Sequence, residues 1–124
     1  MHIQESGEMY LETIYRLLRV HSSVRAIDIG EEMGYSKPSV SRALGLLKSG
    51  GYVTVDGEGH ITLTDAGETI AAKIYERHTV LSAFLISIGV DPETATKDAC
   101  KLEHAFSDTS FYAIKAFLNK HTEK

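Results

Sequence analysis

The segment from Ala26 to Leu63 constrains the fold of this chain more than any other. Residues 26–33 have the spacing of a short helix, and Gly34 follows as a residue type that favours the left-handed conformation after a helix. A second helix is predicted to begin after Ser36, which suits an N-cap, with Pro38 in its first turn, where the missing N–H costs no hydrogen bond. Two short helices joined by a glycine-containing turn are typical of a helix-turn-helix.

Two segments of alternating apolar and polar residues follow this helix pair. Tyr52–Val55 and Ile61–Leu63 predict strands, and the glycine-rich Asp56–His60 between them predicts the tip of a hairpin. A helix-turn-helix followed by a hairpin is a winged helix, and the order, lengths and turn chemistry of the elements all agree. We therefore expect residues 1–64 to form a winged helix-turn-helix DNA-binding domain, which opens with a helix from Ser6, as its N-cap, to about Val20.

The remaining half, residues 65–124, is predicted to be all-helical, so the fold class is mainly α. A long helix is expected from Asp65 to about Ile88, a second from an N-cap at Asp91 to about Phe106, and a third capped by Asp108. The half has more apolar residues than three helices of these lengths can bury alone. We therefore expect a dimerisation domain that packs against a second copy of the chain.

Small polar and basic residues cluster at the start of the second helix of the helix-turn-helix. The net charge of the chain is −4, but residues 16–48 contain six basic residues against three acidic ones. Hydroxyl groups can donate to phosphates or base edges, a lysine or arginine can neutralise phosphate, and arginine can also bind guanine. The candidate contacts to double-stranded operator DNA are Ser36, Lys37, Pro38, Ser39, Ser41 and Arg42. The alternative is a winged helix that serves only protein contacts.

The stretch Cys100–His104 is a candidate metal site. On a helix, Cys100, Glu103 and His104 stand at positions i, i+3 and i+4 and share one face. A thiolate, a carboxylate and an imidazole that face the same way suit a transition-metal ion. Three further candidate ligands are Met9 and Glu12 on the first helix and His78 on the long helix. Each also has an ordinary structural alternative, such as a core methionine, a solvated glutamate or a surface histidine.

Several classes of protein are disfavoured by what the chain lacks. It has no serine–histidine–aspartate pattern, phosphate loop or paired-carboxylate motif, so we expect neither an enzyme nor a small-molecule substrate. No apolar run approaches the roughly 20 residues that cross a bilayer, and no basic segment followed by an apolar one opens the chain. These features predict a cytoplasmic protein without a membrane partner.

Five segments together resemble one known family. They are Glu8–Tyr15, Ser36–Ser41, Tyr75–His78, Gly89–Asp91 and Cys100–His104. The chain resembles, over essentially its full length, the metal-dependent repressors of the diphtheria-toxin-repressor and manganese-transport-repressor family in their short, two-domain form. The resemblance implies binding of a divalent metal between the two halves, dimerisation through the helical half, and repression of metal-homeostasis genes by the loaded protein.

The same resemblance implies two sets of ligands. Met9, Cys100, Glu103 and His104 match the primary site of the iron branch, whereas Glu12 and His78 match a second site of the manganese branch. Sulfur ligands beside imidazole and carboxylate favour Fe(II), Co(II), Ni(II) or Zn(II) over Mn(II), which prefers oxygen. We expect Fe(II) as the effector, because free zinc and nickel are scarce in cytosol. The alternative is a winged-helix regulator without a metal effector, in which Cys100 is structural or redox-sensing.

Overall fold

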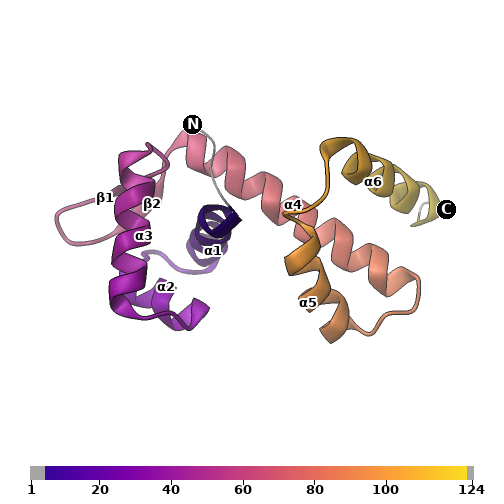
Figure 1. The fold of residues 1–124 in the computed structure, drawn as a ribbon, viewed down its shortest axis with the longest axis horizontal. Helices are drawn as coiled ribbons and strands as arrows, with labels where there is room; N and C mark the ends of the chain where they lie inside the picture. Colours follow the sequence, from indigo (N-terminus) through magenta and orange to yellow (C-terminus); the bar gives the residue numbers. More distant parts are fainter. Residues whose placement is uncertain (1–4, 123–124) are drawn as a thin grey trace. The chain divides into compact units, whose positions relative to one another are not determined.

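The computed structural model describes residues 5–122, and within them side chains from residue 6 to residue 120. The described chain is mainly α-helical, as expected, with one short hairpin (Figure 1). Its elements are α1 (Glu5–Val20), α2 (Ala26–Met33), α3 (Lys37–Ser49), β1 (Val53–Val55), β2 (Ile61–Leu63), α4 (Asp65–Ser87), α5 (Pro92–Leu102) and α6 (Asp108–Thr122). The chain divides within α4 into two compact units, residues 1–72 and 73–124.

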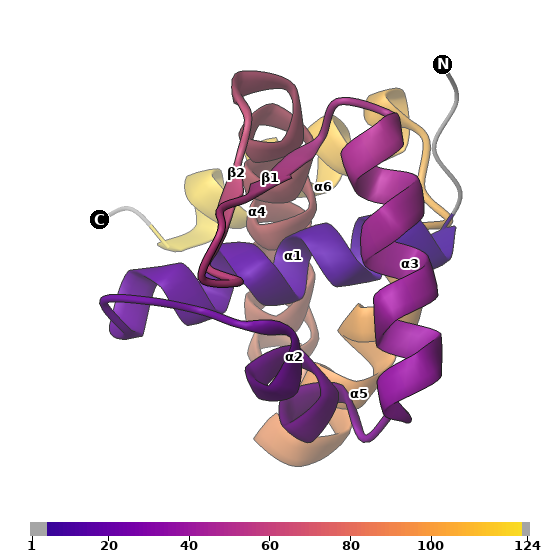
Figure 2. The same cartoon turned by 90° about the vertical axis from the view of Figure 1, so that its left-hand side faces the viewer.

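The first unit is a winged helix-turn-helix, which confirms the predicted fold. In Figure 2, α2, α3 and the β1–β2 hairpin lie around α1. The strands pair antiparallel, with Val53 opposite Leu63 and Val55 opposite Ile61. Apolar side chains from all of these elements share one core, which includes Leu11, Ile14, Val24, Ile29, Val40, Leu44, Leu47, Val53 and Ile61.

Local hydrogen bonds set the turn between α2 and α3. Gly34 has a φ of 73°, and its N–H donates to the Gly30 carbonyl oxygen over 2.8 Å, as expected for a glycine that ends a helix. The Ser36 hydroxyl accepts a hydrogen bond from the Ser39 N–H at 3.4 Å, which confirms the predicted N-cap. Pro38 lies in the first turn of α3. The sequence signals of the helix-turn-helix therefore correspond to bonds within the same few residues.

The wing is held by the Asp56 carboxylate at its tip. Asp56 Oδ1 accepts hydrogen bonds from the N–H groups of Glu58 and His60, both over 2.9 Å. At the base of the wing, the Ile61 N–H donates to the Val24 carbonyl oxygen over 2.8 Å. The hairpin is thereby fixed to the segment that leads into α2.

Thr64 joins the hairpin to the start of α4. Its hydroxyl oxygen accepts a hydrogen bond from the Gly67 N–H at 3.1 Å, and its O–H donates one to the Gly51 carbonyl oxygen at 2.6 Å. A Cβ atom at Gly67 would stand only 2.0 Å from the Tyr52 carbonyl oxygen. The first turn of α4 therefore packs directly on the backbone that precedes β1, and only glycine fits there.

The second unit comprises the rest of α4 together with α5 and α6. Its buried apolar side chains include Ile74 and Leu81 of α4, Ala95 and Ala99 of α5, and Phe111 of α6. The Asp91 carboxylate accepts a hydrogen bond from the Thr94 N–H over 3.0 Å, which confirms the predicted N-cap of α5. None of the helices in the described part of the chain is long and apolar enough to cross a membrane.

Three predicted helix boundaries are wrong. Ser6 lies inside α1, which already includes Glu5, and a serine hydroxyl is compatible with a helix interior as well as with a cap. α5 ends at Leu102 rather than near Phe106, and the turn after it is tighter than an α-helix, because the Ala105 N–H donates to the Leu102 carbonyl oxygen, three residues earlier, over 2.9 Å.

The third wrong boundary concerns the start of α6. Asp108 is the first residue of this helix rather than its cap. The residue before it, Ser107, acts as the cap, because its hydroxyl accepts a hydrogen bond from the Ser110 N–H at 3.2 Å. Serine and aspartate are both good caps, so residue type alone did not show which of the two neighbouring residues is the cap.

Candidate functional site

Four of the predicted metal ligands meet in the second unit, where the end of α5 approaches α4. His78 on α4 places its Nδ1 atom 3.0 Å from Glu103 Oε2 and 3.6 Å from Cys100 Sγ. The other carboxylate oxygen, Glu103 Oε1, lies 3.4 Å from His104 Nε2. The Glu103 carboxylate is therefore bracketed by two imidazole rings, and the Cys100 thiol lies against one of them.

The carboxylate at the centre of this group is buried. The side chain of Glu103 is 1% exposed and that of His104 is 2% exposed, whereas Cys100 is open to solvent. Burial of an ionised carboxylate is costly unless a positive charge and hydrogen bonds compensate it. A protonated imidazole or a bound cation can supply that charge.

The path of the backbone explains how three residues of one short stretch reach the same place. Glu103 is the C-cap of α5 and keeps helical dihedral angles, with φ −60° and ψ −24°, so Cys100 and Glu103 remain one helical turn apart. His104 lies beyond the helix, in the turn that follows it. The prediction that a helix presents all three side chains is therefore wrong for His104, which the turn brings to the carboxylate instead.

The two remaining predicted ligands lie in the first unit. Met9 and Glu12 stand three residues apart on α1, where Met9 is half-buried and Glu12 is buried. The Thr13 hydroxyl donates to the Met9 carbonyl oxygen over 2.9 Å, within the helix. The participation of Met9 and Glu12 in metal binding stays a prediction.

The donor atoms gathered in the second unit fit a divalent transition-metal ion. One thiol sulfur, one carboxylate and two imidazole rings lie within 3.0 to 3.6 Å of a neighbouring donor. Imidazole and thiolate are ligands of Fe(II), Co(II), Ni(II) and Zn(II), and the carboxylate adds the negative charge that a dication needs. The chemistry of this set therefore agrees with the kind of ion that the sequence predicts.

The predicted DNA contacts lie together on the surface of the first unit. Ser36 at the N-cap of α3 and the five candidates that follow it are all exposed, whereas Val40, Leu44 and Leu47 hold the opposite face of α3 in the core. A recognition helix contacts base edges with its N-terminal residues. The geometry therefore suits DNA binding, and the individual contacts stay a prediction.

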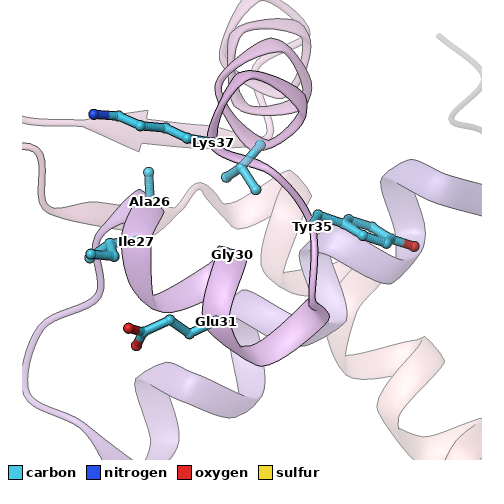
Figure 3. Close-up of a pocket in the computed structure, with 7 residues that line it drawn as sticks. Ala26, Ile27, Gly30, Glu31, Tyr35 and Lys37 are labelled. Atoms are coloured by element: carbon cyan, nitrogen blue, oxygen red, sulfur yellow. The ribbon is translucent and has the colours of Figure 1, made fainter.

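The sequence reading missed a hollow of about 350 Å³ between α2 and the start of α3. Ala26, Ile27 and Val40 supply apolar lining, and Figure 3 shows Glu31 and Lys37 on opposite sides of it. The sequence did indicate an apolar residue outside the core here. Ile27 is two positions from the core residue Ile29, so the two side chains lie on different faces of the helix. Ile27 is 67% exposed.

The sequence reading also missed Arg77, which precedes His78. Arg77 is buried, and it stands on the apolar face of α4 between Ile74 and Leu81. The spacing of Ile70, Ile74, Arg77 and Leu81 is that of one helix face, so a charged residue in this series indicates a buried arginine with partners.

One of the partners of Arg77 is a carboxylate with an altered pKa. Asp108 Oδ1 accepts hydrogen bonds from Lys73 Nζ at 2.9 Å and from Arg77 Nη2 at 2.5 Å. The hydrogen bond from Lys73, with the positive charges of Lys73 and Arg77, holds the pKa of Asp108 below its ordinary value. This carboxylate is therefore charged at neutral pH and ties the start of α6 to α4.

The chain combines a winged helix-turn-helix with a helical unit in which thiol, carboxylate and imidazole groups converge. This combination defines a DNA-binding regulator with a metal-binding domain. Residues 2–61 match the family model of the iron dependent repressor N-terminal DNA binding domain, and residues 64–124 match that of the iron dependent repressor metal binding and dimerisation domain. The chain belongs to this family of metal-dependent transcriptional repressors, as its sequence motifs predict.

Relatives of the chain include transcriptional regulators of bacteria. The chain is 33% identical over 123 residues to the transcriptional regulator MntR of Escherichia coli O157:H7, covering 99% of this chain and 79% of the relative. It is 29% identical over 119 residues to the iron-dependent repressor IdeR of Mycobacterium tuberculosis (strain ATCC 25618 / H37Rv), covering 95% of this chain and 52% of the relative. These relatives are regulators rather than enzymes, which confirms the prediction that this chain is not an enzyme.

Solved structures support the same fold. A manganese-dependent transcriptional repressor in complex with manganese superposes with a TM-score of 0.84 at 30% identity. The match covers 91% of this chain and 52% of that one, so this chain spans about half the length of that repressor. The structure of the manganese regulator SloR matches with a TM-score of 0.81 at 28% identity, covering 96% of this chain and 55% of that one.

Proposed function

We propose that this chain is an Fe(II)-responsive repressor that binds double-stranded operator DNA as a homodimer and controls metal-homeostasis genes. The observation that carries the proposal is the buried Glu103 carboxylate, 3.0 Å from His78 Nδ1 and 3.4 Å from His104 Nε2, with the Cys100 thiol 3.6 Å from the same His78 atom. A cluster of these donors around a buried negative charge is suited to a dication.

The proposed ligands come from several elements. Cys100, Glu103 and His104 come from the end of α5, and the turn after it, and His78 comes from α4. Met9 and Glu12 on α1 are proposed to complete the set, which would link the winged helix to the helical unit. The bound ion supplies positive charge and fixed bonds to these donors. Without those bonds the recognition helices sample more arrangements, and the affinity for DNA falls with the population of the competent one.

The exposed start of α3 supports the proposed contact with DNA. Lys37 and Arg42 would neutralise phosphates, and Arg42 would also bind a guanine edge in the major groove. The serine hydroxyls of the same turn would donate to phosphates, and Pro38 would lie against the bases. Two copies of α3 in a dimer would match the two half-sites of an operator.

Exposed apolar side chains in the second unit support the proposed homodimer. Ile86 and Ile88 lie near the end of α4, and Tyr112 and Phe117 lie on α6, all with substantial exposed surface. Apolar surface of this kind is commonly buried in an interface. The matched family model describes this part of the chain as a metal binding and dimerisation domain.

The identity of the metal rests on the balance of donors. A thiolate from Cys100 and a thioether from Met9 favour Fe(II) over Mn(II). Mn(II) remains the second candidate, because the contact between His78 and Glu103, with Glu12 added, offers oxygen and nitrogen donors without sulfur. Co(II), Ni(II) and Zn(II) also suit the mixed set.

An anaerobic titration with Fe(II) and Mn(II), read out by binding to the DNA upstream of the protein's own gene, tests this function. We expect tight DNA binding with Fe(II), and strong loss of it in Cys100→Ala and His104→Ala. His21→Ala, at an exposed histidine after α1, is the control and should behave as the wild type. Equal DNA binding with and without metal in the wild type would reject the metal effector and favour the alternative regulator in which Cys100 is structural or redox-sensing.

A further inference from the structure

Arg77 is a buried cation that the proposed metal site does not use directly. It is 5% exposed and precedes His78 on α4, so the two side chains leave the helix in different directions. A buried arginine is stabilised by hydrogen bonds from its guanidinium group and by compensation of its charge. Its partners therefore show what it holds in place.

Within the described part of the chain, the contacts of Arg77 reach the turn after α5 and the start of α6. Nη1 donates to the carbonyl oxygens of Glu103, at 3.1 Å, and Phe106, at 2.6 Å. Nη2 donates to Asp108 Oδ1 at 2.5 Å, and the guanidinium carbon lies 5.3 Å from the centroid of the Phe111 ring. One side chain thus binds both ends of the connection between α5 and α6.

The two carbonyl groups belong to residues 103–106, the stretch that includes Glu103 and His104. The last carbonyl groups of a helix have no partner within the helix, so an external donor can decide how the chain leaves it. Here the guanidinium group is that donor for Glu103, the C-cap of α5, and it also binds the Phe106 carbonyl oxygen beyond the helix. Arg77 binds the main chain of Glu103, which leaves the Glu103 carboxylate to face His78 and His104.

A planar guanidinium is needed for this arrangement. It presents several N–H donors in fixed directions, so it can bind two carbonyl oxygens and a carboxylate together. A lysine keeps the charge but carries it on a single rotating ammonium group, which cannot reproduce the fork. The geometry therefore depends on arginine rather than on positive charge alone.

We propose that Arg77 is a positioning residue for the metal centre, which holds residues 103–106 so that Glu103 and His104 face His78. The inference rests on the proposed function of these residues as metal ligands. Arg77 does not supply a donor to the metal. Groups that orient metal ligands commonly affect metal affinity by tenfold to a hundredfold when they are replaced.

The test compares the anaerobic binding of Co(II) by the full chain in four forms: wild type, Arg77→Lys, Arg77→Met and Arg16→Met. Arg16 is a matched control, because it forms a partly exposed ion pair with Glu32 at 3.7 Å, within the first unit. We expect both Arg77 variants to bind Co(II) about tenfold or more weakly. Arg16→Met should keep wild-type affinity.

The unfolding temperature of each metal-free protein separates positioning from simple stabilisation. Affinity is measured at a temperature at which every variant is folded. If an Arg77 variant is less stable but binds Co(II) as the wild type does, the role of Arg77 is only structural and the inference is wrong. If the wild type itself binds no divalent metal, the proposed function fails, and this inference fails with it.

A measurement on the wild-type protein covers the case in which the Arg77 variants do not fold. Nuclear magnetic resonance of the metal-free protein should detect scalar couplings from the Arg77 guanidinium nitrogens to the carbonyl carbons of Glu103 and Phe106. Slow exchange of the guanidinium protons with water should accompany them. Rapid exchange without these couplings would overturn the inference, because a mobile guanidinium cannot hold the turn.

Discussion

His78 and Glu103 stand 25 residues apart in the sequence, yet His78 Nδ1 lies 3.0 Å from Glu103 Oε2. The contact joins α4 to the end of α5 and makes a buried carboxylate the centre of the donor cluster. The same His78 atom is 3.6 Å from Cys100 Sγ. Substitutions at the carboxylate therefore give the most direct test of what the cluster is for.

Replacement of Glu103 by glutamine should separate metal binding from folding. The amide is close to the carboxylate in size but has no charge, so we expect at least about a hundredfold loss of Co(II) affinity. The metal-free protein should melt within a few degrees of the wild type, because removal of a buried charge also removes its desolvation cost. Calorimetry and thermal unfolding in the presence of a chelator measure the two effects.

Glu58→Gln is the matched control for this substitution. Glu58 lies exposed in the wing and undergoes the same chemical change. It should leave Co(II) affinity unchanged. If Glu103→Gln bound Co(II) as tightly as Glu58→Gln, the carboxylate would not be a ligand.

Arg42→Ala should weaken DNA binding and reduce its salt dependence. A phosphate contact contributes about one to the slope of log affinity against log salt concentration, so the slope should fall by about that amount. Fluorescence anisotropy with operator DNA from 50 to 200 mM salt measures it. Lys101→Ala, which removes an exposed basic residue from α5, should preserve the slope. An unchanged slope in Arg42→Ala would remove this residue from the proposed contacts.

Ile88→Glu should shift the protein from dimer to monomer. Ile88 is an exposed apolar residue after α4, and a charge in an apolar interface is costly to desolvate. Sedimentation velocity at micromolar concentration measures the shift. Val20→Glu, at an exposed apolar residue of the first unit, should remain dimeric. A dimer that both substitutions leave intact would place the interface away from Ile88.

Asp108→Asn should destabilise the metal-free protein in a pH-dependent manner. Because Lys73 and Arg77 hold the pKa of Asp108 below its ordinary value, the folded state binds a proton on this carboxylate less readily than the unfolded state. The stabilisation is therefore complete above the ordinary aspartate pKa of about 3.9 and is lost as the pH falls through the lower, folded-state pKa.

Urea unfolding at several pH values tests this sign. The free energy of unfolding of the variant should be lower than that of the wild type at pH 7, and the difference between the two free energies should shrink as the pH falls below about 4. Asp98→Asn, at an exposed residue of α5, should lack this trend. A difference that grew towards acid pH would contradict the assignment.

Gly67→Ala should destabilise the first unit by more than about 2 kcal/mol, because the new Cβ atom would overlap backbone that cannot easily move. It would stand 2.0 Å from the Tyr52 carbonyl oxygen. Gly45→Ala is the opposite case, since its Cβ meets no atom within 4 Å in the middle of α3. That substitution should stabilise the protein by about 0.5 to 1 kcal/mol. Chemical denaturation measures both, and an equal effect of the two would contradict the close packing at Gly67.

The sequence by itself determined the elements whose bonds are local. Gly34, Ser36 and Asp91 make their capping bonds within four residues along the chain, so residue type and position were enough to predict them. The strands of the wing followed from alternation and a glycine-rich tip. The candidate ligands in Cys100–His104 were also visible, because their spacing is a local property.

Only the tertiary structure decided how the chain leaves α5 and what surrounds Glu103. Arg77 binds carbonyl oxygens of the turn after α5, and the setting of the Glu103 carboxylate depends on His78. Both partners lie on α4, some 25 residues earlier in the chain. A pattern of neighbouring residues predicts a helix or a cap because those bonds close within a turn, whereas a buried ion pair forms only where packing brings distant residues together.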